Sequence, residues 1–139
     1  STHCISSAAS DVYKRQGAVN AEVILDIGNG AELAAIITND SADHLALEVG
    51  SEAYALVKAQ WIILTVETNF KTSARNSLTG TVVRCQEGAV NAEVVIELPG
   101  GKTVASIITN ESVKTLGLKE GLRATAMIKA SHIILAVPA

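Results

Sequence analysis

Apolar and polar residues alternate along the stretch "NAEVVIEL", residues 91–98. Val94, Ile96 and Leu98 fall on one face of an extended chain, and Glu93, Val95 and Glu97 fall on the other. A period of two is typical of a β-strand that buries one face. The pattern therefore predicts a half-buried strand over residues 91–98.

The segments on either side predict the rest of a small β domain. Further strands are expected over residues 77–88, 102–109, 122–130 and 131–137, and "PGG" predicts a hairpin turn after residue 98. Between the third and fourth strands, Asn110 precedes an acidic residue, and Val113 and Leu116 have helical spacing before Gly117. These features predict a capped helix of one or two turns. Five short strands with one such helix are typical of a small closed barrel of the oligonucleotide/oligosaccharide-binding kind, which places the chain in the all-β class.

The same domain is expected twice. "GAVNAEV" occurs at residues 17–23 and again at 88–94, and 24 of 48 positions are identical when residues 17–64 are aligned with 88–135. A period of this size is longer than that of solenoid repeats, so each copy should be a small domain. We expect domain 1 over residues 17–66, a linker over 67–72, and domain 2 over 73–139.

Residues 1–16, "STHCISSAASDVYKRQ", do not follow the repeat at the offset of 71 positions. One hypothesis is that they are a cloning or sequence-assembly remnant that replaced the natural start of the first copy. The other is a genuine but divergent first strand that uses Val12 and Tyr13. Neither hypothesis gives His3 or Cys4 a function.

Composition narrows the possible functions. The chain is 48% apolar with one Phe, one Trp and two Tyr, so its core must consist of Val, Ile, Leu and Ala. Domains this small often gain stability by pairing or by oligomerising. The first half carries a net charge of −5 and the second +2, without a basic run or a row of aromatic residues, so nucleic acid is not an expected partner. The absence of an apolar run of roughly 20 residues and of an export signal predicts a cytoplasmic protein without a membrane span.

Small polar residues and a lysine recur at equivalent places of both copies. They are Thr38 and Ser41 with Thr109 and Ser112 at the helix start, and Lys58 with Lys129 between two apolar strands. The second copy adds "SARN", Ser73–Asn76, before its first strand. Hydroxyl groups, unpaired amides at a helix start and one or two cations are suited to binding an oxyanion.

Each of these pieces also has a purely structural interpretation. Thr or Ser at a helix start usually caps the helix, and a lysine at a strand junction is usually a solvated charge. Glu22 and Glu93 also recur, on the polar face of a strand where solvation is the default. Because no histidine, cysteine or pair of carboxylates recurs in a catalytic arrangement, we do not expect an enzyme.

Four motifs in order carry a family resemblance. "SARNSLTGTV", "EGAVNAEV", "IITNESVKTLGLKEG" and "IKASHIILA" resemble the molybdate-binding Mop (molbindin) domain over residues 73–137, and residues 17–64 resemble it a second time. Tandem copies are similar to the di-Mop molbindins, which store or buffer molybdate. The resemblance implies two five-stranded barrels of the oligonucleotide/oligosaccharide-binding type, with oxyanions bound between Mop units, and three chains assembled around a threefold axis.

The resemblance also implies the binding residues. One side of each site would come from the Ser-Ala-Arg-Asn motif and the Lys-Ala segment, and the other side from the helix start of an opposing unit. The residues that match are Ser73, Ala74, Arg75, Lys129 and its neighbour Ser131 on one side, and Thr38, Ser41, Thr109 and Ser112 on the other, with Lys58 as the counterpart of Lys129. The ligand would be molybdate, with tungstate not distinguished from it, and no cofactor is implied.

The first copy departs from the family because it lacks the Ser-Ala-Arg-Asn motif. We therefore expect either two classes of site with different affinities or the complete class alone. Two alternatives stay open: a molybdate-sensing module of a transcription regulator or transporter ATPase, and a scaffold that binds no ligand.

Overall fold

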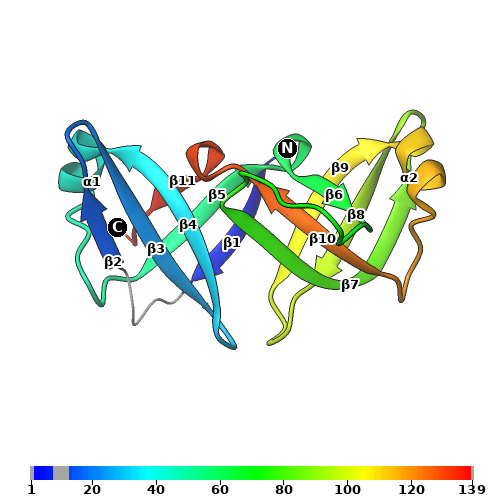
Figure 1. The fold of residues 1–139 in the computed structure, drawn as a ribbon, viewed down its shortest axis with the longest axis horizontal. Coiled ribbons are helices and arrows are strands. Elements are labelled where there is room, and N and C mark those ends of the chain that lie inside the picture. Colours follow the sequence, from blue (N-terminus) through cyan, green and yellow to red (C-terminus); the bar gives the residue numbers. More distant parts are fainter. Residues whose placement is uncertain (1, 8–12, 139) are drawn as a thin grey trace.

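The computed structural model describes the backbone of residues 2–7 and 13–138, with side chains from residue 17 onward. The first copy contains β1 (Thr2–Ser7), β2 (Tyr13–Gln16), β3 (Asn20–Gly28), β4 (Ala31–Thr38), α1 (Asn39–His44), β5 (Ala53–Lys58), the 3-10 turn η1 (Ala59–Trp61) and β6 (Ile63–Thr65). The second contains β7 (Asn76–Glu87), β8 (Asn91–Glu97), β9 (Thr103–Thr109), α2 (Asn110–Leu116), β10 (Arg123–Ile128), the 3-10 turn η2 (Ala130–His132) and β11 (Ile134–Ala136). The two copies lie side by side, with α1 and α2 at opposite ends of the molecule (Figure 1).

The last strand of each copy pairs with the other copy. β6 is antiparallel to β10, and β11 is antiparallel to β5. In Figure 1, β11 therefore lies in the half of the molecule that contains β3 and β4, and β6 lies beside β10 in the other half. We expected residues 131–137 to close their own copy, and this expectation was wrong. The 3-10 turns η1 and η2 carry the chain across instead.

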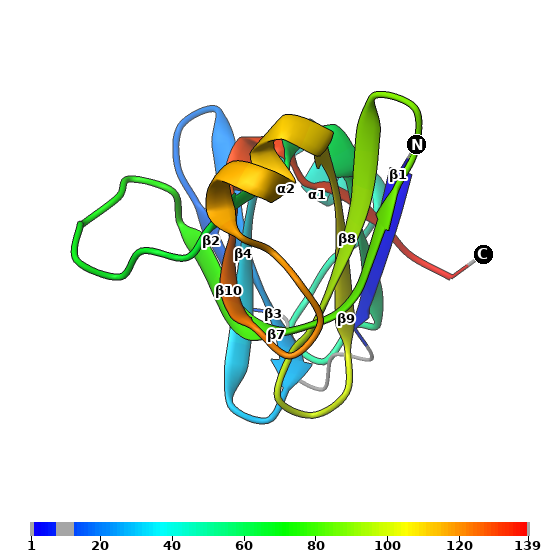
Figure 2. The ribbon, with the colours of Figure 1, turned by 90° about the vertical axis from the view of Figure 1, so that its right-hand side faces the viewer.

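The sheets are open, whereas a closed barrel was expected. The second copy has the strand order β6-β10-β7-β8-β9, so β6 and β9 are its edges, and the first copy is divided into β1-β5-β11 and β2-β3-β4. A side chain bridges the open edge of the second copy, because the buried Ser106 of β9 donates a 2.6 Å hydrogen bond to the carbonyl of Ile62, just before β6. The first copy has Ala35 at the position of Ser106 and cannot make this bond. The arrangement of strands and helix is nevertheless that of two tandem five-stranded domains of the oligonucleotide/oligosaccharide-binding type. The view of the second copy from its end shows the curvature of these strands below α2 (Figure 2).

Residues at the start of the chain take the place of β7 in the first copy. Ser7 of β1 pairs with Ala53, and the equivalent pair in the second copy is Gly80 with Ala124. Gln16 of β2 pairs with Ala21, and the equivalent pair in the second copy is Glu87 with Ala92. The two ends of this segment therefore match the second copy at different offsets, 73 positions for β1 and 71 for β2. A single offset of 71 hid the correspondence in the sequence. Strand pairing of this kind is what the hypothesis of a divergent first strand expects; Tyr13 begins β2, and Val12 lies outside the described residues.

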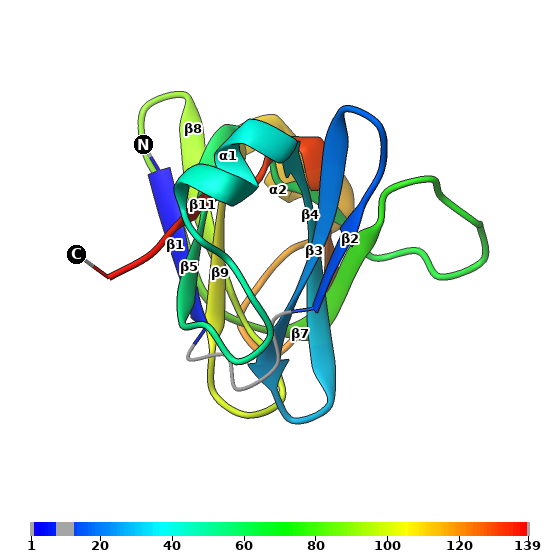
Figure 3. The same ribbon diagram turned by 90° about the vertical axis from the view of Figure 1, so that its left-hand side faces the viewer.

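One glycine of β7 allows a close approach between two strands of the second copy. β7 pairs first with β10 and then with β8, and its register shifts between Val82 and Arg84. A Cβ atom at Gly80 would lie 2.2 Å from the carbonyl oxygen of Glu97, so only glycine allows this close crossing. The first copy has Ser7 at this position, and β1 ends there. Figure 3 shows β1 and β2 as separate strands on either side of the first copy.

The core confirms the prediction from composition. The cluster of buried residues consists entirely of Val, Ile, Leu and Ala from both copies, and Val94, Ile96 and Leu98 are all buried, as their alternation predicted. None of the helices in the described part of the chain has the length and apolar composition needed to cross a membrane.

Asn76, the last residue of the "SARN" motif, joins the two copies. Its buried side-chain amide accepts a 2.7 Å hydrogen bond from the N–H of Ala34 and donates one of 2.8 Å to the carbonyl of the same residue, in β4 of the first copy. It also donates to the carbonyl of Ile128 in β10. Asn76 thus acts as a strand partner for β4 and has a structural role.

The two helices begin alike and end differently. Thr38 and Thr109 are the N-caps, and each hydroxyl accepts a hydrogen bond from the backbone N–H three residues later. The side-chain amide of Asn110, the residue after the cap, donates to the carbonyl of Gly88. α2 ends at Gly117 with a φ of 66°, which glycine adopts without strain. The first copy has Ala46 at this position with a φ of 52°. Because the flanking hydrogen bonds are the same in both copies, Ala46 must be held in the left-handed region by its surroundings.

Replacing Ser106 with alanine tests the bridge across the open edge. Ser106→Ala leaves the Ile62 carbonyl without the hydroxyl that it accepts from, which should lower the free energy of unfolding by about 1–3 kcal/mol. Urea denaturation followed by circular dichroism measures this change. Ser77→Ala, at an exposed position of β7, is the control and should stay within about 0.5 kcal/mol of the unchanged chain. Equal effects of the two variants would show that the bridge is unimportant.

Exchanging glycine and alanine at the helix ends tests the strain at Ala46. Ala46→Gly should raise the free energy of unfolding by about 0.5–1 kcal/mol, because glycine removes the strain of a positive φ. Gly117→Ala is the reciprocal variant and should lower it by about 1–2 kcal/mol. Both follow from urea denaturation. A loss of stability in Ala46→Gly would contradict the argument.

Candidate oxyanion-binding site

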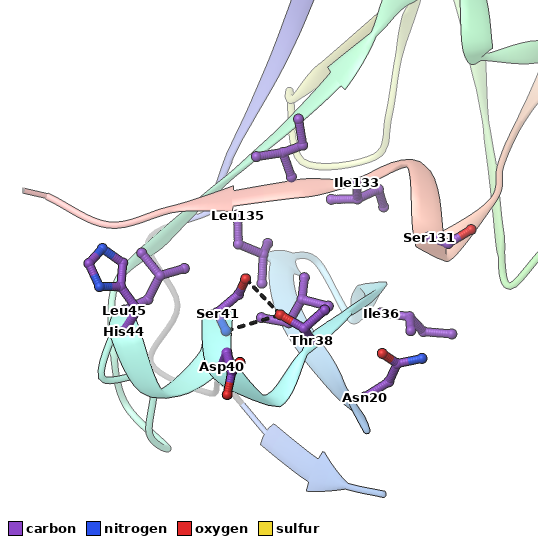
Figure 4. Close-up of a pocket in the computed structure, with 12 residues that line it drawn as sticks. Asn20, Ile36, Thr38, Asp40, Ser41, His44, Leu45, Ser131, Ile133 and Leu135 are labelled. Carbon is purple, nitrogen blue, oxygen red and sulfur yellow. Dashed lines mark hydrogen bonds between the residues drawn. The ribbon is translucent and has the colours of Figure 1, made fainter. Parts of the chain in front are cut away.

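A pocket of about 650 Å³ lies between the helix of the first copy and the exchanged end of the second. Thr38 and Ser41 come from the start of α1, and Ser131 comes from η2 (Figure 4). Ile133 and Leu135 line the same pocket. The exchange of β11 is therefore what brings Ser131 to the helix start of the other copy.

Capping of helix α1 already uses some of the polar groups that line this pocket. The Thr38 hydroxyl accepts from the Ser41 N–H at 3.1 Å and donates to the Ser41 hydroxyl at 2.9 Å. The Ser41 hydroxyl proton remains available to a ligand. Among the described residues that line this pocket, Asp40 is the charged side chain, and none is a lysine or arginine. Their contribution to the pocket is therefore mainly hydroxyl donors.

The positive charge lies in a second pocket of about 250 Å³. Ser73, Ala74 and Lys129 line it, as the resemblance implied for one side of a site. Lys129 follows β10, and Ser73 lies in the segment that connects β6 with β7, which projects from the side of the molecule (Figures 2 and 3). Ser73 and Lys129 are exposed, so a ligand reaches them from solvent.

Two aromatic residues also line this second pocket, and the sequence analysis did not assign them to it. Trp61 and His132 occupy equivalent positions of the two copies, and their rings lie 4.6 Å apart between centroids, tilted by 36°. Lys58 places its Nζ atom 5.6 Å from the centre of the Trp61 ring, at the distance of a cation–π contact. The sequence shows that Trp61 and His132 are equivalent, because they align in the repeat. It does not show their contact, which depends on the strand exchange.

Arg75 is not among the residues that line the second pocket. Its guanidinium Nη1 donates to the Glu22 carboxylate on β3 of the first copy. The hydrogen bond and the charge of Glu22 raise the pKa of Arg75 further. A solvated position was the default interpretation of Glu22 and Glu93, and the structure adds an ion pair to each: Glu22 with Arg75, and Glu93 with Arg84 at 3.7 Å.

The structure thus divides the expected site residues into two groups within one chain. Thr38, Ser41 and Ser131 share the first pocket, whereas Ser73, Ala74 and Lys129 share the second. In the second copy Thr109 and Ser112 repeat the hydroxyl pair, with a 2.8 Å hydrogen bond between them, but Gln60 stands at the position equivalent to Ser131. Lys58 contacts Trp61 and is not among the residues that line either pocket.

The described side chains that could bind a metal ion directly lie apart from one another. Among the side chains described from residue 17 onward, no three His, Cys, Asp or Glu residues are placed to coordinate a metal ion. Cys85 is a free, partly buried thiol, and burial together with Glu87 and Glu120 raises its pKa. It lies in a different pocket from Lys129.

Comparisons with known proteins agree with this architecture. The model of the TOBE domain matches residues 11–64 and 72–135. The chain is 45% identical to the molybdenum transport protein ModE of Azotobacter vinelandii and 44% identical to the molybdenum-pterin-binding protein MopA of Rhodobacter capsulatus, over 88% of its length in each case. It spans 46% of the length of each of these relatives. A crystal structure of the cytoplasmic molybdate-binding protein ModG with molybdate bound matches with a TM-score of 0.88 and 46% identity, over 99% of this chain and 96% of that one.

Two tandem domains with exchanged last strands, each with a threonine-capped helix, define a class of small all-β domain pairs. Within that class, the chain belongs to the TOBE-domain family and carries two tandem TOBE/Mop copies. The resemblance to Mop domains in the sequence is thereby confirmed, and the chain is homologous to ModG and MopA.

Proposed function

We propose that this chain is a cytoplasmic, non-enzymatic protein that binds molybdate for molybdenum storage or homeostasis. The observation that carries the proposal is the second pocket, where Lys129 and Ser73 lie together as the family resemblance expects. The likeness to ModG, which has molybdate bound, supports the same ligand. Hydroxyl, amide and ammonium donors hold a tetrahedral dianion by charge-assisted hydrogen bonds, without covalent or redox chemistry. Tungstate offers the same donors an equivalent partner.

A complete site needs both kinds of pocket. The second pocket supplies the charge, and the helix starts supply the hydroxyl groups of Thr38 with Ser41, or of Thr109 with Ser112. Because one chain keeps these groups in separate pockets, we propose that the helix start of another chain covers the second pocket, in a homotrimer of six Mop units. Exposed apolar side chains support such a contact, since Ile134 lines the first pocket and Ile63 the second, each with about 60% of its surface exposed.

The first copy should provide weaker sites. By strand register, Thr2 takes the position of Arg75 and His3 that of Asn76, so the first copy lacks the Ser-Ala-Arg-Asn motif although it retains Lys58. We propose one complete class of site, built on Ser73 and Lys129, and a second class that is weakened or missing. A ligand-binding role within a longer transport or regulatory protein is the second candidate function, because the chain aligns with 46% of ModE.

Titration with molybdate tests the proposed function. Calorimetry of the full chain, repeated in excess sulfate, should show tight binding that survives sulfate, and the single Trp61 in the second pocket should report the same binding by fluorescence. Lys129→Ala should weaken binding by about 10- to 150-fold through loss of a charge-assisted hydrogen bond. Lys119→Ala is the control, because it removes the same charge in a different pocket. Unchanged binding in Lys129→Ala, or a full set of equal sites, would contradict the proposal.

The mass of the particle tests the proposed assembly. Light scattering on a sizing column should give three times the mass of the 14.4 kDa chain. Ile134→Lys places a charge in the proposed contact and should shift the particle toward the monomer, whereas Val49→Lys, also at an exposed position, should leave its mass unchanged. A monomer at all concentrations would contradict the trimer and leave the second pocket open to solvent.

A further inference from the structure

Arg75 is separated from the residues that it adjoins in sequence. Ser73 and Ala74 line the pocket that contains Lys129, but the Arg75 guanidinium is bound to the carboxylate of Glu22. Glu22 belongs to β3 of the first copy, 53 positions away in sequence. The Arg75 side chain is 48% exposed and that of Glu22 25% exposed, so both are within reach of solvent and of a dissolved anion.

A carboxylate and an oxyanion compete for the same donor. Both accept charge-assisted hydrogen bonds from a guanidinium group, which has five N–H donors and no acceptor. While Glu22 is bound, its carboxylate occupies donors of the Arg75 guanidinium. The dianion must therefore displace Glu22 before it can use those donors, and this displacement weakens binding.

We infer that Glu22 competes with the bound oxyanion for Arg75 and thereby sets the affinity of the site built on Ser73 and Lys129. The inference rests on the proposed function, because it assumes that an oxyanion binds in the second pocket. It assigns Glu22 the role of an affinity-determining residue, contributed by the copy that lacks the Ser-Ala-Arg-Asn motif. The first copy thus acts on the site of the second through a single ion pair.

The repeat provides a matched control for this inference. Glu93 is the counterpart of Glu22, and the nearest cation recorded for it is Arg84, at 3.7 Å. Thr2 takes the position of Arg75 in the first copy, so a threonine stands where this competition would need an arginine. Glu22→Gln and Glu93→Gln therefore change the net charge equally, but only the first frees Arg75.

The test is a calorimetric titration of the full chain with sodium molybdate at low and at high salt. Glu22→Gln should bind molybdate about two- to fivefold more tightly than the unchanged chain at low salt, the range expected for an exposed ion pair. The gain should shrink as salt screens the charges. Glu93→Gln should match the unchanged chain. In an Arg75→Ala background, Glu22→Gln should give no gain, because the group under competition is absent.

The outcomes separate this inference from the proposed function. Tighter binding in Glu22→Gln that disappears in the Arg75→Ala background supports it. Unchanged or weaker binding, or a gain that persists without Arg75, overturns it while leaving molybdate binding intact. Absence of heat from both the unchanged chain and Glu22→Gln would overturn the proposed function and this inference together.

Discussion

The exchange of last strands is the constraint on which the rest of the structure depends. Neither copy contains the strand that completes its own sheet, because β6 pairs with β10 and β11 pairs with β5. The buried Asn76 strengthens this dependence by bonding to the backbone of β4 in the other copy. A small core of aliphatic side chains is thereby enlarged into one cluster shared by both copies. The pockets follow from the same exchange, since Ser131 reaches the helix start of the first copy only on the exchanged segment.

Much of the fold could be predicted from the sequence, because the features that determine it are local. The alternation of Val94, Ile96 and Leu98, the turn after residue 98 and the helix before Gly117 each reflect interactions within a few residues. Strand exchange could not be predicted in this way. The segment that ends in β11 has the same pattern whether it pairs with its own copy or with the other, and it pairs with β5 after the turn η2.

The candidate site, too, could be predicted from the sequence only where its features are local or repeated. The repeat identified Thr38, Ser41 and Lys129 as polar residues in equivalent places, and the structure puts each of them at a pocket. Periodicity could not show that Glu22 binds Arg75, since the two residues are distant in sequence and each looks like a solvated charge. Nor did a fixed offset reveal the start of the first copy, because strand register there differs by two positions from the rest of the repeat.

Joining the copies in one chain also allows the two sides of the contact between them to have different residues. If two identical single-domain chains exchanged strands in this way, the residue equivalent to Trp61 and His132 would contact the same residue of the other chain across a twofold axis. Such an axis would force tryptophan against tryptophan or histidine against histidine. In the tandem chain the two sides are encoded separately, and a large indole packs against a smaller imidazole. Duplication has therefore given this molecule an asymmetric contact between its two copies that a symmetric pair of chains cannot form.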